Sequence, residues 1–259
     1  TNLGMLLSDQ CVHTIKLAVF DGSKKSVFRD RKELTGSLLT QLEDAYTYID
    51  QFNRTRAEFA GLDRIDKRDY PAEALREALL NAITHRDYSF SGSTLISIFD
   101  DRIEFVTIGG LVRGLTFNDI MLGVSALRNQ NLANVLYRLK LIEAYGTGIL
   151  KINESYADCE VKPQFEVTDN AFKITLPNSN YAGERKELPT APVKVTNKAD
   201  RKEIVLQLAK KQGHIIRKDV EAELNISQAT AILLLRDMVE SGLLTKEKAG
   251  KQMKYRIAE

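Results

Sequence analysis

The stretch that decides the fold runs from Tyr70 to Tyr88 and reads YPAEALREALLNAITHRDY. Its apolar residues recur every three or four positions, which predicts a helix from about Pro71 to Thr84 with one buried face. Pro71 suits the first helical position, because the N–H that proline lacks would be unpaired there. Glu77 and Asn81 are four residues apart and therefore share one face of this helix.

A carboxylate and a carboxamide on one helix face can divide two chemical tasks. The amide oxygen of Asn81 can bind a hard cation such as Mg²⁺, which prefers oxygen ligands and keeps several waters. The carboxylate of Glu77 can orient or deprotonate an attacking water. An exposed polar stripe explains the spacing equally well, so the neighbouring motifs are needed to decide between the two interpretations.

Strand-like and helical patterns alternate on both sides of this helix. The predicted elements are a strand at Thr14–Phe20, a helix at Ser37–Phe52, a β-hairpin at Ser93–Phe99 and Arg102–Val106, helices at Asn129–Leu141 and Ile149–Tyr156, and a second hairpin at Phe165–Val167 and Phe172–Leu176. Two glycine clusters interrupt the pattern, Gly109-Gly110 and Gly146-Thr147-Gly148. Glycines let backbone N–H groups approach phosphates, and a helix N-terminus favours anions. Each cluster alone is equally consistent with a turn.

The composition of the 259 residues is that of a folded chain with about two domains, since 43% are hydrophobic and 28% charged. No apolar run approaches the roughly 20 residues that span a bilayer. Two cysteines and three histidines exclude a disulfide scaffold and a closed structural metal site. We therefore expect reduced thiols and a cytoplasmic location, without a membrane partner. The first residue is Thr1, so we expect a segment of a longer chain.

The last part of the chain has a pattern of its own. Its predicted elements are helices at Arg201–Lys211, Arg217–Leu224 and Ser227–Ser241, followed by β-like segments at Leu243–Lys246 and Tyr255–Ile257. This order resembles a winged helix-turn-helix. In such a domain the N-terminal residues of the third helix face DNA bases; here they are Ser227, Gln228, Ala229 and Thr230. We expect the apolar core face of that helix to comprise Ile232, Leu233, Leu235, Met238 and Val239.

A local basic charge accompanies this pattern. The segment from Lys198 to Glu259 has thirteen basic and nine acidic residues, a net charge of +4, which leaves −2 for the rest of a chain whose total is +2. Phosphate neutralisation is what a basic wing supplies, and the candidate wing contacts are Lys246, Lys248, Lys251 and Lys254. A winged helix can instead serve protein interaction or dimerisation, and a basic hairpin can simply be solvated.

The motifs of the larger part, taken together, resemble a known fold. Glu77-x-x-x-Asn81, a hairpin, a glycine loop and Gly146-Thr-Gly148 resemble the nucleotide-binding fold shared by gyrase, histidine kinases and MutL, the GHKL class. Closer still, these motifs resemble a bacterial and archaeal family of transcriptional regulators often labelled RecG-related ATP-dependent DNA helicases. The segments that carry this resemblance are Pro71–Tyr88, Phe99–Glu104, Gly109–Leu111, Leu127–Asn129 and Leu141–Ile149. In that family a Schlafen-like AlbA domain precedes the ATPase-like domain, and a winged helix often follows.

The resemblance implies α+β architecture, with a GHKL-like sandwich of a mixed sheet and helices on one face, then a small winged helix. It implies four regions: 1–60, a remnant of the AlbA-like domain with a connecting strand and helix; 61–177, the ATPase-like domain; 178–197, a linker; and 198–259, the winged helix. The implied cofactors are ATP and Mg²⁺, with Asn81 as the Mg²⁺ ligand and Glu77 as the water-activating residue.

The same resemblance assigns the rest of the site. Gly109 and Gly110 would line the adenine end, and Gly146, Thr147 and Gly148 would hold phosphates. The lid would run from Leu111 to Tyr145 and include Arg128 and Asn129. One departure concerns Thr107, which occupies the position where the GHKL class usually has an Asp that reads the adenine amino group. A hydroxyl can form a hydrogen bond there, but not a charge-assisted one.

Two other enzyme classes are excluded by missing motifs. His85-Arg86-Asp87 matches the kinase catalytic tripeptide, but the chain has neither Asp-Phe-Gly nor a glycine-rich loop with a following strand lysine. We expect His85 and Arg86 instead to close the helix C-terminus, where cations are favoured. No Walker A sequence is present, so nothing in the chain would drive a helicase.

Three functions follow as hypotheses. The first is a DNA-binding transcriptional regulator, expected as a homodimer, whose GHKL-like domain senses a nucleotide or acts as a scaffold. The second is a weak Mg²⁺-dependent ATPase that uses Glu77 and Asn81. The third is a protein-interaction module with a vestigial pocket. Thr107 favours the first, because the charge-assisted adenine contact is missing.

Overall fold

The computed structural model describes residues 2–143, 146–183, 198–224, 228–249 and 252–258. The chain divides into two compact units, residues 1–193 and 194–259. Among the described residues, no helix is long and apolar enough to cross a membrane.

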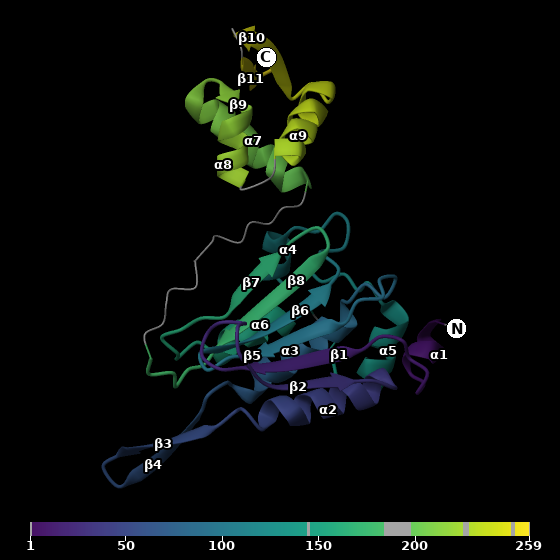
Figure 1. Cartoon of the computed structure of the whole chain (residues 1–259), viewed down its shortest axis with the longest axis vertical. Helices are drawn as coiled ribbons and strands as arrows, with labels where there is room; N and C mark the ends of the chain where they lie inside the picture. The colour runs from purple at the N-terminus through teal and green to yellow at the C-terminus, as the bar shows by residue number, and fades with distance from the viewer. Residues whose placement is uncertain (1, 144–145, 184–197, 225–227, 250–251, 259) are drawn as a thin grey trace. The chain divides into compact units, whose positions relative to one another are not determined.

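The first unit is built around a mixed sheet (Figure 1). Its elements are α1 (Asn2–Leu6), β1 (Ile15–Phe20), β2 (Phe28–Leu34), α2 (Leu38–Asp50), β3 (Thr55–Ala60), β4 (Asp63–Arg68), α3 (Ala72–Thr84), β5 (Thr94–Ile98), β6 (Arg102–Ile108), α4 (Phe117–Met121), α5 (Gln130–Arg138), α6 (Gly148–Ser155), β7 (Gln164–Val167) and β8 (Ala171–Pro177). In the described part, six strands form the sheet in the order β2-β1-β5-β6-β8-β7. Only the β1–β5 pairing is parallel among them. The predicted mixed sheet with helices is therefore confirmed.

The helices α2 and α3 form one layer against this sheet. α2 contacts β1 and β2, α3 contacts β6 and β8, and the two helices contact each other. Alternate residues of β1, such as Ile15 and Leu17, are buried, while Lys16 between them is exposed. On α3 the buried face includes Leu75 and Leu79. Burying each such side chain contributes roughly 1.5–3 kcal/mol, which fixes α3, and hence Glu77 and Asn81, against the sheet.

The predicted elements of this unit are all present within a few residues of their expected ends. α3 begins at Ala72, with Pro71 as the residue that precedes the helix rather than its first turn. Two domain boundaries expected from the sequence, after residue 60 and after residue 177, fall inside the folded first unit. β1 and β2 precede residue 60 yet belong to the main sheet, and Asn178 and Ser179, in the expected linker, donate backbone hydrogen bonds to Asp101 and Asp69. Residues 184–197 of that linker lie outside the described residues.

Five elements of the first unit were not predicted: α1, β2, α4, and the two strands of the β3–β4 hairpin. The hairpin is a separate two-stranded sheet in the described part of the chain. It projects from the body of the unit, with its closed end farthest away (Figure 1).

The second unit has three helices and three strands in its described part. They are α7 (Lys198–Gln212), β9 (Ile215–Ile216), α8 (Arg217–Leu224), α9 (Gln228–Glu240), β10 (Leu244–Ala249) and β11 (Gln252–Ile257). The strands pair in the order β10-β11-β9, and β9 was not predicted. The buried core draws on all three helices, for example through Val205, Val220 and Leu235.

One prediction for this unit was wrong. Ile232 and Leu233 were expected in the core, but 46% and 65% of their surface is exposed. The buried residues of α9 are Ala231, Leu234, Leu235 and Met238, and Val239 packs partly buried against them. The spacing of i, i+3, i+4 and i+7 from Ala231 selects this face of the helix, so Ile232 and Leu233 fall outside it.

Candidate functional site

An open cavity of about 480 Å³ lies in the first unit. Its walls are one face of α3, the loop that follows β6, the segment that carries α4 and α5, and the turn that begins α6. Most residues that were expected to bind a nucleotide line this cavity: Glu77, Asn81, Thr107, Arg128 and both glycine clusters. The structure thus brings together motifs that are spread over more than seventy residues of sequence.

Glu77 lies on the cavity wall with only 13% of its side chain exposed. Its carboxylate accepts a hydrogen bond from Arg76 at 2.6 Å. Burial raises the pKa of Glu77, and the charges of Arg76 and Lys151 oppose that rise. A carboxylate with a raised pKa is a better proton acceptor than an exposed one.

Asn81 lies one turn further along α3. Its side-chain nitrogen donates to the Glu77 carbonyl at 2.9 Å, which leaves the amide oxygen as the atom free to accept a ligand. Within the described residues, no cluster of three His, Cys, Asp or Glu side chains could hold a metal ion. A Mg²⁺ ion fits this donor set only in its usual manner, with one or two protein oxygens and the remaining positions filled by water and phosphate.

The turn at Gly146–Gly148 packs tightly against this pair. A Cβ atom on Gly148 would lie 2.7 Å from the amide nitrogen of Asn81 and 3.1 Å from the carboxylate of Glu77. Gly146 has φ of +69°, and a Cβ there would lie 2.6 Å from the Gly123 carbonyl oxygen. Only glycine allows the start of α6 to approach α3 this closely, and Thr147 between them also lines the cavity.

The cavity is also lined by Thr107 and the Gly109-Gly110 loop. Thr107 is buried, and its hydroxyl donates to the Ala82 carbonyl at 2.8 Å. With its proton used in this way, the hydroxyl can only accept from a ligand. The loop rests on the β7–β8 turn, because Gly109 donates to the Asn170 carbonyl at 2.8 Å and Gly110 abuts the backbone of Thr168.

The two candidate lid residues have different roles. The Arg128 guanidinium donates to Asp87 at 3.0 Å and to the Gly110 carbonyl at 2.9 Å, and it lines the cavity. Asn129 does not line the cavity. Its amide donates to the carbonyls of Thr84 and Arg86 at 2.9 and 2.7 Å. Asn129 therefore caps the end of α3 and ties it to α5, and its expected contact with a nucleotide stays a prediction.

Several cavity residues were not predicted. Lys151 lies one turn after Gly148, and its ammonium group is 2.8 Å from the carboxylate of Glu143. This hydrogen bond raises the pKa of Lys151, so the side chain is a stable cation beside Glu77. The sequence signal that could have identified Lys151 is its position three residues after Gly148, on the same face of the helix. Asp87 lies outside the cavity lining, and its contact with Arg128 was not predicted, because the two residues are distant in sequence.

The expectation that His85 and Arg86 close the C-terminus of α3 is met by His85 but not by Arg86. His85 is the C-cap residue of α3, but burial and the charge of Arg128 lower its pKa, which favours the neutral ring. Arg86 is buried, and its guanidinium donates to the carbonyls of Phe90 and Gly92. It holds the loop that leads into β5 rather than the end of the helix.

The DNA-contact candidates lie on the second unit. Gln228, at the start of α9, and Lys246, on β10, are exposed, while Lys254 on β11 is half-buried. Ser227 and Lys251 lie outside the described residues, as do the side chains of Thr230 and Lys248.

Comparisons with known proteins match part of this picture. Residues 92–176 match the family model described as "Putative ATP-dependent DNA helicase recG C-terminal". The match supports a RecG-related, ATPase-like domain; it includes both glycine clusters and begins after α3. No curated protein matches the chain. The solved structure of the DIP2311 protein from Corynebacterium diphtheriae is similar in fold, with a TM-score of 0.62 and 20% identity. That similarity covers 98% of this chain and 53% of that one, so the chain spans about half its length.

Proposed function

We propose that this chain is a DNA-binding transcriptional regulator whose first unit binds a magnesium nucleotide in the 480 Å³ cavity. The observation that carries the proposal is the convergence of three kinds of group on one cavity: the Glu77–Asn81 pair, the glycine turn that begins α6, and the cation Lys151. The match to a RecG-related ATPase-like family over residues 92–176 supports the same assignment.

We propose one orientation for a nucleotide in this cavity. Phosphates would lie at Gly146–Gly148, where backbone N–H groups at the start of α6 and the charge of Lys151 favour anions. The base would lie beside Thr107 and the Gly109-Gly110 loop. Because the Thr107 hydroxyl donates to Ala82, it would accept a hydrogen bond from an amino group, such as that of adenine.

The residues around the phosphates also allow slow hydrolysis, which is the second candidate function. Mg²⁺, when bound, would neutralise phosphate charge and orient the phosphates, held on the protein side by the Asn81 amide oxygen. Glu77 would accept a proton from the attacking water, and its raised pKa favours that role. Nothing in the described cavity supplies a motor, so we propose at most a weak ATPase and no helicase.

The second unit is proposed to be a winged helix that contacts DNA. Its order of helix, strand, helix, helix and β-hairpin is that of the class, its net charge is +4 counted from Lys198, and Gln228 and Lys246 are exposed. A homodimer would present two such units to a two-fold symmetric DNA site.

A thermal-shift assay with a panel of nucleotides, with and without Mg²⁺, tests the cavity. A ligand at 100 times its Kd should stabilise the protein by about 2.7 kcal/mol. Asn81→Ala should abolish the Mg²⁺-dependent part of the shift. Asn153→Ala is the matched control, since Asn153 lies on α6 outside the cavity. If no nucleotide shifts the melting temperature, the pocket is vestigial and the chain is better assigned as an interaction module.

A salt titration tests the DNA contact of the whole chain. Replacing Lys246 and Lys254 by Ala should reduce the slope of log Kobs against log salt by about 2, because each phosphate contact contributes about 1. Replacing Lys210 and Lys211, in the last turn of α7, is the control with the same change of charge. Equal slopes for both double variants would exclude the wing as the DNA contact.

A further inference from the structure

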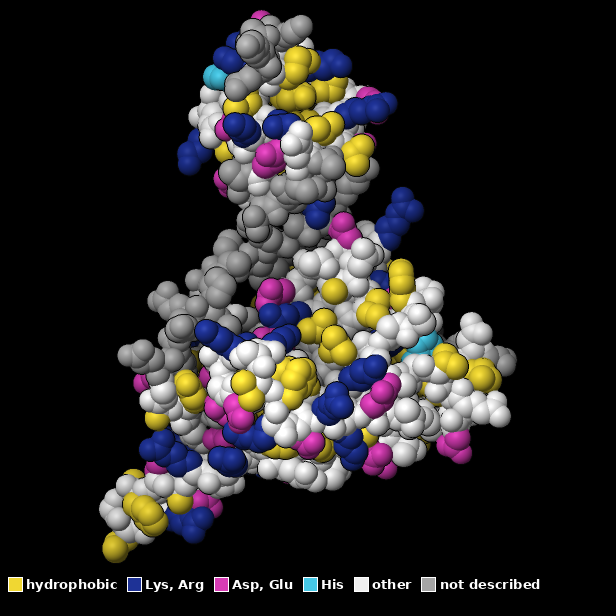
Figure 2. All heavy atoms as spheres, in the orientation of Figure 1, with side chains coloured by type: hydrophobic (Ala, Val, Ile, Leu, Met, Phe, Trp, Pro, Cys, Tyr) yellow, Lys and Arg dark blue, Asp and Glu magenta, His cyan; other side chains and the backbone are white. Residues whose placement is uncertain are grey.

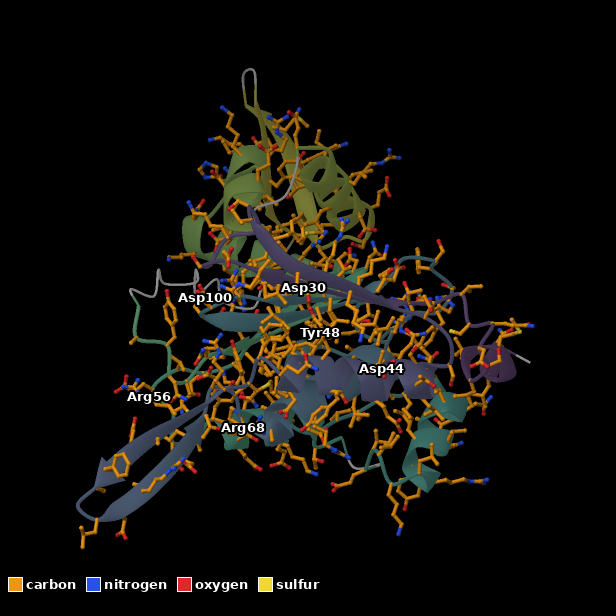
Figure 3. All side chains as sticks on the ribbon, turned by 60° about the horizontal axis from the view of Figure 1, so that its bottom comes forward. Asp30, Asp44, Tyr48, Arg56, Arg68 and Asp100 are labelled. Atoms are coloured by element: carbon orange, nitrogen blue, oxygen red, sulfur yellow. The ribbon has the colours of Figure 1, made fainter. Side chains whose placement is uncertain are left out.

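The β3–β4 hairpin is a ribbon that projects from the first unit (Figures 1 and 3). The body of the unit contacts it at its base, where Arg68 donates to Asp50 and Asn53, and Asn180 donates to the Lys67 carbonyl. Every residue of β4 is exposed, and the tip carries Phe59 and Leu62 at 72% and 103% exposure. Figure 2 shows hydrophobic side chains at the end of this projection and both signs of charge along it. A lone two-stranded hairpin is at best marginally stable in water, so a strand added to its edge would stabilise it.

The outer edge of β4 has backbone groups available for such pairing. At the base of the hairpin, the Asp69 N–H donates to the Arg54 carbonyl at 2.9 Å. Because bonded pairs alternate along an antiparallel ladder, the odd-numbered residues of β4 point their backbone polar groups toward β3. The N–H and C=O groups of Arg64 and Asp66 therefore point to the free edge, and a free edge of this kind readily pairs with another strand.

The charges along β4 change sign symmetrically about Ile65. Asp63 and Arg64 precede it as negative then positive, and Asp66 and Lys67 follow it as negative then positive. When two copies of this strand run antiparallel with Ile65 opposite Ile65, each Arg64 faces an Asp66 and each Asp63 faces a Lys67. The same alignment places the outward backbone groups of Arg64 and Asp66 opposite each other. Charge pattern and hydrogen bonding thus select one register.

We infer that β4 pairs with β4 of a second copy of this chain, which joins two chains in a two-fold symmetric dimer through a four-stranded ribbon. Edge strands of monomers usually carry charges that repel a second copy, whereas this edge attracts one. Within one chain, Arg64 pairs with Asp66 and Lys67 with Glu58. These ion pairs are exposed and worth little, so their partners can be exchanged.

Other occupants of this edge fit less well. From Arg54 to Asp69 the hairpin carries five basic and four acidic residues, which gives little net attraction to nucleic acid. The free edge of β3 offers one complementary pair, Arg56 with Glu58, where β4 offers two. The dimer would form even if the cavity bound no nucleotide and the second unit no DNA, so its test is independent of the proposed function.

Two charge variants of the full chain test the register. Asp63→Lys with Asp66→Lys makes the four paired positions 63, 64, 66 and 67 all basic. Arg64→Glu with Lys67→Glu makes the same four positions all acidic. The unmodified chain should have the mass of a dimer by light scattering. Each variant alone should dissociate, with the Kd raised at least about 100-fold, because four attractive pairs become repulsive. An equimolar mixture of the two should recover the dimer mass, since a base then faces an acid at each of the four paired positions.

Each alternative outcome is decisive. Recovery on mixing shows that both variants fold, so it cannot arise from damaged protein. The inference would be overturned if the unmodified chain were monomeric at a concentration 100 times a typical micromolar Kd. Variants that remain dimeric alone would also overturn it, because the dimer would then use another surface. Dissociation without recovery on mixing, with unchanged thermal melting, would reject this register.

Discussion

The wall of the cavity on α3 and the β3–β4 hairpin are adjacent in sequence but differ in what holds them. α3 buries a continuous face that includes Ala74, Leu75 and Leu79 against the sheet, so its position is fixed by packing from several elements. Both strands of the hairpin are almost wholly exposed. They are held mainly by the ladder between them, with a few hydrogen bonds to the body at the base. The comparison teaches that a site requiring exact placement of two side chains is built on the first kind of element. A surface that is completed by a partner can be built on the second kind.

Truncating one apolar side chain in each region should give the largest difference between them. Leu79→Ala should reduce the free energy of unfolding by about 2–5 kcal/mol, because Leu79 is 1% exposed and its removal leaves a cavity. Ile65→Ala, on a side chain 44% exposed, should cost less than about 0.5 kcal/mol in dilute monomeric protein. Chemical denaturation followed by circular dichroism measures both. A cost at Ile65 close to that at Leu79 would break the comparison.

Gly148→Ala should produce the next largest effect, and it acts on the contact between α3 and α6. The added methyl would meet the Asn81 amide at 2.7 Å, so the helix or the side chain must shift at a cost of about 1–3 kcal/mol. The shift displaces Asn81 and Glu77 from their common site, and nucleotide binding by calorimetry should fall below detection. Ala at Asn153, on the same helix, should leave binding unchanged. Normal binding by the Gly148 variant would mean that this contact does not shape the site.

The two regions also differ in how far the sequence predicts them. The helical spacing of Leu75, Ala78 and Leu79 predicts α3, because burial imposes a period that can be read from residue types. The hairpin has charged residues at most positions of β4 and no buried face, so no alternation marks it as a strand. Its one local signal was Gly61, which has φ of +66° in the turn.

The candidate site also has residues that the sequence predicts and contacts that it does not. Glu77, Asn81 and the glycine clusters were found through motifs within short stretches. The Arg128–Asp87 contact joins residues 41 positions apart, and no local pattern pairs them. For α9 the helical period was evident, but Ile232 and Leu233 were assigned to the wrong face. Choosing that face requires knowing which side of the helix packs against its neighbours. The five consecutive apolar residues from Ala231 to Leu235 occupy several sides of the helix, so they do not determine it.

Lys151→Met should have a moderate effect on the cavity. Removing a cation that contacts phosphate costs about 1.5–3 kcal/mol, so nucleotide affinity should fall about 10- to 100-fold. Lys24→Met is the matched control, since Lys24 is exposed in the same unit and outside the cavity. The contrast in binding between nucleoside and nucleotide should also shrink in the Lys151 variant. If both variants lose affinity equally, the effect comes from net charge rather than from a contact at the cavity.

The smallest expected effect is the cost in folding stability of burying the Glu77 carboxylate. It sharpens the comparison because the same burial that fixes α3 causes the cost. Burial raises the pKa of Glu77 above the ordinary value of 4.5, so the native state binds its proton more tightly than the unfolded state does. Stability then falls as pH rises from the unfolded pKa through the folded one, and the full cost is present at neutral pH. Glu77→Gln should therefore raise the melting temperature at pH 7 relative to the unmodified chain, and the gain should vanish below about pH 4, where Glu77 is protonated in both states.

Glu73→Gln, on the exposed face one turn earlier, should show no such gain. A Glu77 variant that is less stable at pH 7 would mean that the ion pair with Arg76 at 2.6 Å outweighs the cost of burial. Glu77 would then be a structural residue of the wall rather than a base kept there for its chemistry.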